Sequence, residues 1–112
     1  MYTVYLADDE QLIREGLAQT IPWDSLGLQL IGTAEDGRQA LKEIREKKPD
    51  IVLTDIRMPY LDGLDLIGKI REVHPDCRVV IITGHGEFSY AKTAIQLGVS
   101  DFVLKPIDIT AL

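Results

Sequence analysis

Apolar residues along this chain gather into short runs separated by segments with a different periodicity. Four runs are nearly continuous, at residues 2–7, 51–54, 79–82 and 102–104. Runs of this length without polar alternation are typical of strands buried on both faces of a sheet. A further strand is predicted near residues 29–34. The pattern therefore predicts five strands.

The segments between these strands repeat apolar residues at the spacing of an amphipathic helix. Helices are predicted before Pro22, before Pro49, from about Gly63 and over residues 87–97. The predicted apolar positions are Leu12, Ile13, Leu17 and Ile21 in the first, Ala40, Leu41 and Ile44 in the second, and Leu64, Leu66, Ile67 and Ile70 in the third.

The order of these segments predicts the fold class. Strands that alternate with helices imply right-handed crossovers and a parallel sheet covered on both faces, which is an α/β fold. Trp23 lies in a connector, and Asp36-Gly37 is predicted to form a turn. A fifth helix would begin after Pro106, but the sequence stops at Leu112, so we expect that helix to be truncated. A length of 112 residues predicts one domain over 1–112.

Composition and charge exclude several classes of protein. Hydrophobic residues make up 46% and charged residues 27%, as in ordinary globular proteins. Twelve basic and eighteen acidic residues give a net charge of −6, the wrong sign for covering a nucleic acid backbone. The N-terminus lacks a secretory signal and no run could span a membrane, which predicts a cytoplasmic location. Cys77 stands alone, so we expect no disulfide, no multi-cysteine zinc site and no chemical role.

Polar residues follow the ends of four apolar runs. Asp8 and Asp9 follow the first, Asp55 follows residues 51–54, Thr83 follows 79–82, and Lys105 follows 102–104. Because the carboxyl ends of parallel strands meet at one edge of a sheet, where α/β proteins bind ligands, we expect these side chains to gather there.

Three neighbouring carboxylates oppose one another's ionisation unless a cation compensates them. Oxygen ligands select hard cations, and Mg²⁺ takes one or two carboxylates together with a phosphate oxygen. Asp9 and Asp55 suit this role, with Asp8 nearby. The residues therefore favour a magnesium site.

Each of these residues also has a purely structural interpretation. Asp8-Asp9-Glu10 suits the start of a helix, where acidic residues cap the first turn. Lys105 could be a surface lysine, and threonine such as Thr83 is common in strands. Asp55 is harder to explain in this way, because a carboxylate after a buried strand needs a partner or a wet pocket.

Taken together, the motifs resemble a known family. Asp8-Asp9, Asp55, Met58-Pro59, Asp62-Gly63, Thr83-Gly84 and Lys105-Pro106 follow the order found in the receiver domain of two-component response regulators. The resemblance covers essentially the whole chain. It implies a flavodoxin-like, doubly wound, five-stranded parallel sheet with strand order 2-1-3-4-5. It also implies a signalling domain without independent substrate turnover, and so not a conventional enzyme.

The resemblance implies that Asp55 accepts a phosphoryl group from a sensor histidine kinase and forms an acyl phosphate. It implies that Mg²⁺ is held by the side chains of Asp9 and Asp55 and by the backbone carbonyl of Arg57. Asp8 would hold a water molecule or orient the site. These roles are expectations carried over from the family.

The resemblance further implies how phosphate is sensed. Thr83 would hydrogen-bond the phosphoryl group and Lys105 would pair with it, with a cis peptide between Lys105 and Pro106. Phe102 matches the family's switch aromatic and would rotate as Thr83 moves, although a plain core aromatic is an equal alternative. His85 and Arg57 match positions that tune the loss of phosphate.

A second resemblance concerns the output. The connector with Trp23 and residues 83–91 are similar to receivers fused to an AraC-type DNA-binding domain. This implies a C-terminal output domain in a longer parent protein and control of transcription. DNA would be a partner only through that missing domain, and phosphorylation could promote a homodimer.

Three alternatives remain at this stage. A Mg²⁺-dependent phosphatase of the haloacid dehalogenase kind would need a second aspartate where Arg57 stands. A flavodoxin-like FMN binder would need a phosphate-cradling first turn, whereas this turn is acidic. A receiver-like interaction module independent of phosphorylation would have lost the acceptor or the acidic pocket, and the sequence retains both.

Overall fold

The structure, a computed structural model, describes residues 1–55, 58, 60, 61, 63–83 and 101–104, with the backbone alone at 63, 83 and 101–104. The predicted fourth and fifth helices lie outside the described residues. The elements are β1 (Tyr2–Ala7), α1 (Gln11–Thr20), the 3₁₀ helix η1 (Asp24–Leu26), β2 (Leu28–Ala34), α2 (Gly37–Lys47), β3 (Ile51–Asp55), α3 (Gly63–Val73), β4 (Arg78–Thr83) and β5 (Asp101–Leu104).

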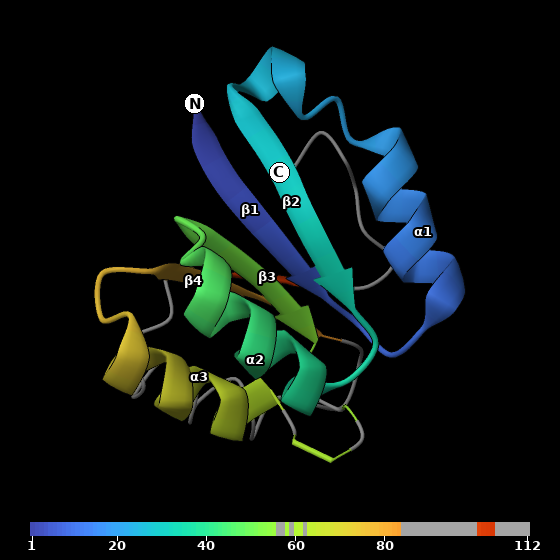
Figure 1. Cartoon of the computed structure of the whole chain (residues 1–112). Coiled ribbons are helices and arrows are strands. Elements are labelled where there is room, and N and C mark those ends of the chain that lie inside the picture. Colours follow the sequence, from blue (N-terminus) through green and yellow to red (C-terminus); the bar gives the residue numbers. More distant parts are fainter. Residues whose placement is uncertain (56–57, 59, 62, 84–100, 105–112) are drawn as a thin grey trace.

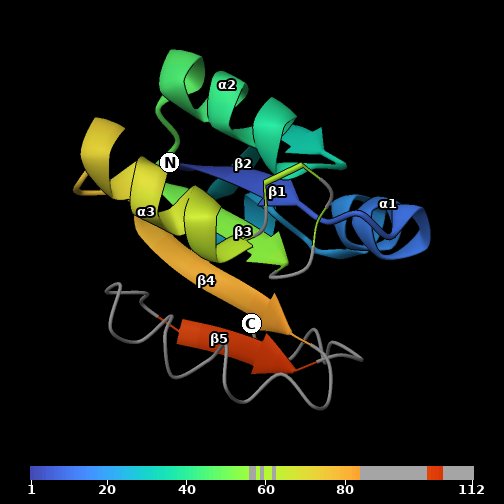
Figure 2. The same cartoon turned by 90° about the horizontal axis from the view of Figure 1, so that it is seen from below.

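The five strands form one parallel sheet in the order β2-β1-β3-β4-β5, which confirms the predicted class and strand order. Figure 1 shows α1 on one side of this sheet and α2 with α3 on the other; Figure 2 shows the same layers from below. The chain runs outward from β1 in one direction to β2 and in the other through β3 to β5. The carboxyl ends of β1 and β3 therefore flank the topological switch point, where doubly wound folds bind ligands.

Alternating side chains of the strands build a core on each face of the sheet. In β1, Tyr5 and Ala7 pack with α2 and α3, whereas Val4 and Leu6 pack with α1. The larger core also contains Ala40, Leu41 and Ile44 of α2 and Leu66, Ile67 and Ile70 of α3, as predicted. This double coverage explains the nearly continuous apolar runs in the sequence.

The structure differs from two local predictions, wholly at Leu12 and in part at Asp36-Gly37. Leu12 is 87% exposed, because it lies about 100° around α1 from Ile13, which packs on the core. The chain bends at Glu35 and Asp36, between β2 and α2, as predicted, but Gly37 is already the first helical residue. Asp36 is also the N-cap of α2, where its side chain accepts a 2.8 Å hydrogen bond from the Gln39 backbone N–H.

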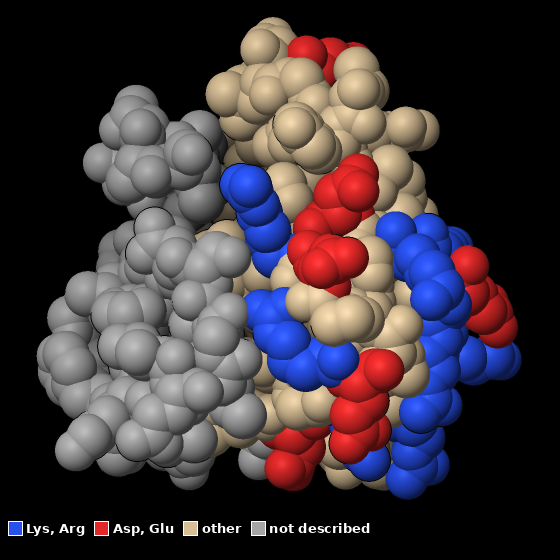
Figure 3. Space-filling view, turned by 90° about the vertical axis from the view of Figure 1, so that its left-hand side faces the viewer, with Lys and Arg blue, Asp and Glu red and all other residues tan. Residues whose placement is uncertain are grey.

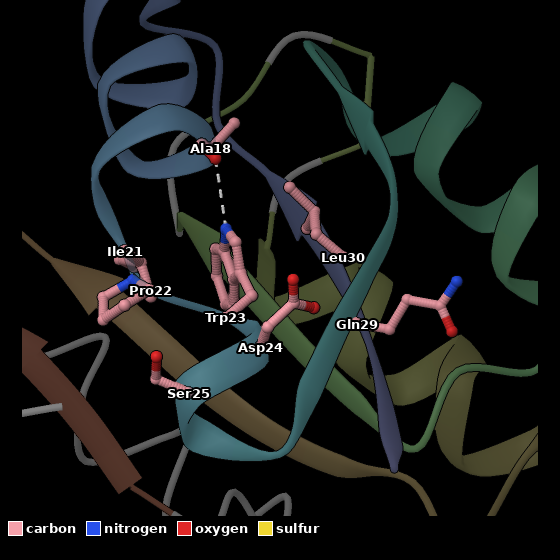
Figure 4. A pocket seen from close by; sticks show the side chains of 8 residues that line it. All are labelled: Ala18, Ile21, Pro22, Trp23, Asp24, Ser25, Gln29 and Leu30. Carbon is pink, nitrogen blue, oxygen red and sulfur yellow. Dashed lines mark hydrogen bonds between the residues drawn. The ribbon is translucent and has the colours of Figure 1, made fainter.

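The connector that contains Trp23 is an ordered structure. Trp23 is partly buried against the α1 core, and its indole N–H donates a 3.1 Å hydrogen bond to the Ala18 carbonyl (Figure 4). Gly27 ends η1 at φ 74°, a conformation that glycine adopts without steric cost. The connector is thereby anchored to the last turns of α1.

The outer side of α2 is charged: Lys42, Arg45, Glu46 and Lys47, together with Lys48 at the C-cap, are exposed. Figure 3 shows basic and acidic side chains side by side on one face of the molecule. Among the described helices, none is both long and apolar enough to cross a bilayer. Cys77 is buried in the core, and its burial raises the pKa of the thiol to about 11, which keeps it protonated at neutral pH.

A partly buried polar contact links the sheet to α2. The hydroxyl of fully buried Tyr5 donates a hydrogen bond to Glu43, whose other oxygen lies 3.2 Å from the Lys47 ammonium. The Tyr5 hydrogen bond is the largest cause that lowers the pKa of Glu43. Burial is the largest cause that raises the pKa of Tyr5, which keeps its hydroxyl protonated as a donor.

We expect Tyr5→Phe to cost about 1 kcal/mol at neutral pH and to weaken the acid sensitivity of folding. A carboxylate with a lowered pKa contributes stability above its unfolded pKa, and that stability is lost as pH falls through the folded pKa. The wild type should therefore lose more stability than Tyr5→Phe below about pH 4.5, in urea unfolding measured across pH. Tyr2→Phe, at an exposed tyrosine, is the matched control. Equal acid losses in wild type and Tyr5→Phe would contradict this.

Candidate metal centre

The strand register places two of the predicted acidic residues, Asp8 and Asp55, next to each other. Ala7 of β1 pairs with Thr54 of β3, so Asp8 and Asp55, the next residue on each strand, lie side by side at the carboxyl edge. Asp55 in turn pairs with Ile82 of β4. Since β3 has a hydrogen-bonded neighbour on each side, Asp55 projects from a rigid central strand.

Four carboxylates converge at this edge. One oxygen each from Asp8, Asp9, Glu10 and Asp55 lies within 4.8 Å of the others. Asp8 is fully buried and Asp55 is 4% exposed, whereas Asp9 and Glu10 are exposed. Buried carboxylates that crowd together need a compensating cation, and an all-oxygen donor set suits Mg²⁺. The residues present therefore fit a divalent hard cation.

Glu10 is the member that sequence reasoning missed, because it was considered only as part of a helix start. The signal was present in the sequence as a third consecutive acidic residue. Which of the three would face the site depends on how the chain turns between β1 and α1, and the sequence pattern does not specify that turn.

Three hydrogen bonds, each with at least one backbone partner, shape the loop after β1. The Asp8 N–H donates to the Ala34 carbonyl at 3.1 Å, and Asp8 Oδ1 accepts from the Glu10 N–H at 2.9 Å. The Arg14 guanidinium donates to the Asp8 carbonyl at 2.9 Å. The N-cap of α1 is Glu10, which makes no side-chain capping bond. Asp8 and Asp9 thus do not cap α1, contrary to the helix-start interpretation.

Thr54, the residue before Asp55 in β3, is firmly placed in the core. Thr54 is fully buried, and its hydroxyl donates a 2.9 Å hydrogen bond to the Asp55 carbonyl. This bond occupies the polar group of Thr54 inside the core, where an unpaired hydroxyl would be costly. Asp55 is therefore presented at the edge by a satisfied, well-packed strand.

The remaining predicted residues are placed only in part. The backbone of Thr83 ends β4 one residue beyond the partner of Asp55, at the same edge of the sheet. Phe102 lies in β5, paired with Ile81. Arg57, His85, Lys105 and Pro106 lie outside the described residues, so the predictions for them, including the cis peptide, stay predictions.

The fold and this edge define a flavodoxin-like α/β domain with an acidic cluster, of a kind that could hold a metal ion, at the β1/β3 switch point. The chain matches the family described as response regulator receiver domain over residues 4–112. It belongs to that family, and receiver domains bind Mg²⁺ at such an acidic cluster.

Curated relatives agree with this assignment. The chain is 48% identical over 106 residues to the transcriptional regulatory protein YesN of Bacillus subtilis, covering 95% of this chain and 29% of YesN. It is 46% identical over 108 residues to the transcriptional regulatory protein HptR of Staphylococcus aureus, covering 96% of this chain and 42% of HptR. The chain thus spans less than half the length of these relatives.

Solved structures agree as well. The receiver domain of AraT, a response regulator from Geobacillus stearothermophilus, matches with a TM-score of 0.93 and 42% identity, covering 98% of this chain and 85% of that one. A two-component transcriptional regulator AraC from Clostridium phytofermentans matches with a TM-score of 0.88 and 36% identity, covering 98% and 85%. The similarity to AraC-type receivers predicted from the sequence is confirmed.

Proposed function

We propose that this chain is the phosphoacceptor of a two-component phosphorelay and that Asp55 takes the phosphoryl group. The observation that carries the proposal is the convergence of Asp8, Asp9 and Glu10 on Asp55 at the end of a central strand. Phosphoryl transfer needs an aligned nucleophile and neutralised charge more than it needs acid–base chemistry. The cluster supports the proposal because it would hold a divalent cation beside Asp55, and that cation would neutralise the charge.

In the proposed reaction, one Asp55 carboxylate oxygen attacks the phosphorus of the donor. An oxygen–phosphorus bond forms as the bond to the donor's leaving group breaks, and the leaving group keeps that electron pair. Bound Mg²⁺ would neutralise charge on the phosphoryl oxygens. Asp9 and Asp55 would hold it together with the Arg57 carbonyl, with Asp8 and Glu10 beside them.

The phosphorylated state would then be read by a conformational change. Phosphate adds about −1.5 to −2 charge and strong acceptor oxygens, for which Thr83 and Lys105 would supply a hydroxyl and an ammonium donor. Thr83 and Phe102 would act as the switch, biasing a two-state equilibrium that a partner reads. The position of Thr83 one residue beyond the level of Asp55 supports its part in this proposal.

The partners follow from the same assignment. A sensor histidine kinase would be the donor, and this chain would act in the cytoplasm. The names of the relatives support a transcriptional output, which we assign to a DNA-binding domain outside these residues. We also propose that phosphorylation promotes a homodimer. Retention of the acceptor and of the acidic cluster argues against an interaction module independent of phosphorylation. Arg57 argues against a phosphatase of the haloacid dehalogenase kind.

The proposal is tested with a small phosphodonor. Incubation with acetyl phosphate and Mg²⁺ is expected to add one phosphoryl mass to the intact protein, and chelation of Mg²⁺ with EDTA is expected to prevent this. Slow loss of the added mass would indicate a switch, and rapid turnover of donor would indicate a phosphatase. A protein that gains no phosphoryl group, or gains it equally in EDTA, would refute the mechanism.

A further inference from the structure

The connection between β2 and α2 contacts both loops that flank the acidic cluster. At one end, the Ala34 carbonyl accepts the 3.1 Å hydrogen bond from the Asp8 N–H. At the other end, Gly37 and Arg38 contact Leu61 and Tyr60, which follow Asp55 in the chain. Residues 34–38 thus join the two sides of the site without supplying a carboxylate to the cluster.

We propose that residues 34–38, here named the β2–α2 brace, position the segment after Asp55 relative to the Asp8 loop, and so position the metal site for phosphoryl transfer. This inference rests on the proposed function. Gly37, Arg38 and Tyr60 are positioning residues, since none of them belongs to the carboxylate cluster.

Gly37 gives the brace its closest contact. A Cβ atom at this position would lie 1.8 Å from the Leu61 carbonyl oxygen and 2.7 Å from its carbonyl carbon. The obstruction is backbone, so no side-chain rotation can relieve it. Leu61 packs on the core beside α2 and α3, where Met58 is also buried. Any side chain at position 37 would therefore push the Leu61 backbone away by more than 1 Å.

The second contact of the brace is a cation–π pair. The Arg38 guanidinium lies 4.8 Å from the centre of the Tyr60 ring. Tyr60 has φ 68°, a left-handed conformation that is unfavourable for an aromatic residue, and it is 76% exposed. Burial therefore contributes little to holding Tyr60 in place. Among the residues that the structure describes, the Arg38 guanidinium is the contact that holds the ring. Glycine would adopt the same backbone conformation without strain.

These contacts bear directly on the reacting group. Asp55 ends β3, and Met58, Tyr60 and Leu61 fall within the next six residues of the chain. Asp55 is 4% exposed and already lies against three other carboxylates, so its oxygens have little freedom to readjust. A displacement of 1 Å in such a site can reduce a rate by about 10²-fold.

The first test is Gly37→Ala, with Gly68→Ala as the matched control. A Cβ at Gly68, inside α3, meets nothing within 4 Å. We expect Gly37→Ala to slow acetyl phosphate labelling about 10²-fold and to raise the Mg²⁺ concentration that gives half the maximal rate. Gly68→Ala should label like the wild type. Circular dichroism reports whether each variant is folded.

The second test separates positioning from stability at Tyr60. Tyr60→Gly relieves the left-handed strain, so its thermal midpoint should equal or exceed that of the wild type, whereas its labelling should be slower and need more Mg²⁺. Tyr60→Phe keeps the ring and should restore wild-type labelling. A residue with a merely structural role would change labelling and stability in the same direction.

The proposal would be overturned if folded Gly37→Ala were labelled at the wild-type rate and with the wild-type dependence on Mg²⁺. The same result in Tyr60→Gly would also overturn it. If Gly37→Ala does not fold, the labelling of Tyr60→Gly alone tests the proposal. If the wild type itself is not labelled, the proposed function fails separately. In that case, the rise in thermal midpoint on adding Mg²⁺ tests the role of the brace. We expect this rise to be smaller in Tyr60→Gly than in Tyr60→Phe and the wild type.

Discussion

Replacing Asp55 by Asn is expected to abolish Mg²⁺-dependent labelling by acetyl phosphate. The substitution keeps the shape of a side chain that is 4% exposed, so the fold should be retained. An amide cannot form the acyl phosphate, because it lacks the anionic oxygen that attacks phosphorus. It also removes one of the four charges that favour a divalent cation. The measurement is the intact mass of the protein after incubation with donor.

Asp24→Asn is the matched control for this experiment, because Asp24 is an exposed aspartate in η1, outside the cluster. It should take one phosphoryl group at the wild-type rate. Label that persists in Asp55→Asn would show that another carboxylate is the acceptor. Peptide mapping would then identify it, with Asp8, Asp9 and Glu10 as its neighbours in the cluster.

Replacing Asp9 by Asn is expected to make the metal-free protein more stable and to remove most of the stabilisation by Mg²⁺. Without metal, four carboxylate oxygens within 4.8 Å repel one another, and loss of one charge relieves this. With metal, a ligand that binds only the folded state stabilises it, by about 2.7 kcal/mol at one hundred times its dissociation constant. The variant loses a charged ligand and with it most of that gain.

Thermal unfolding with and without Mg²⁺ measures both effects. The two curves should be well separated for the wild type and for Asp24→Asn, and nearly superimposed for Asp9→Asn. Glu10→Gln tests the carboxylate found only in the structure: an intermediate separation would place it at the metal. Equal Mg²⁺ shifts in the wild type and Asp9→Asn would exclude Asp9 as a ligand.

The parts of this protein that could be predicted are those controlled by one-dimensional patterns. Continuous apolar runs located four of the five strands, because strands covered on both faces have no polar alternation. Helical spacing located Ala40, Leu41 and Ile44 in the core of α2. The carboxyl-edge rule brought Asp8 and Asp55 together, and the register of Ala7 with Thr54 confirms their proximity.

The errors share a cause. Leu12 was assigned to the buried side of α1 because it is apolar. Which side of a helix is buried, however, depends on the elements that pack against the helix. Gly37 was predicted in a turn with Asp36 and is instead the first residue of α2, which Asp36 caps. Glu10 was interpreted only as part of a helix start, because an acidic residue can either cap a helix or bind a metal ion.

By itself, the sequence determined the α/β class, the strands and the acidic edge, because these follow from hydrophobic periodicity and from the common direction of parallel strands. Only the tertiary structure decided that Glu10 joins the cluster, that the brace touches both of its sides, and that Gly37 has no room for a side chain against Leu61. Such contacts join residues far apart in the chain. They depend on how the loops pack in three dimensions, and no local pattern of residues encodes that packing.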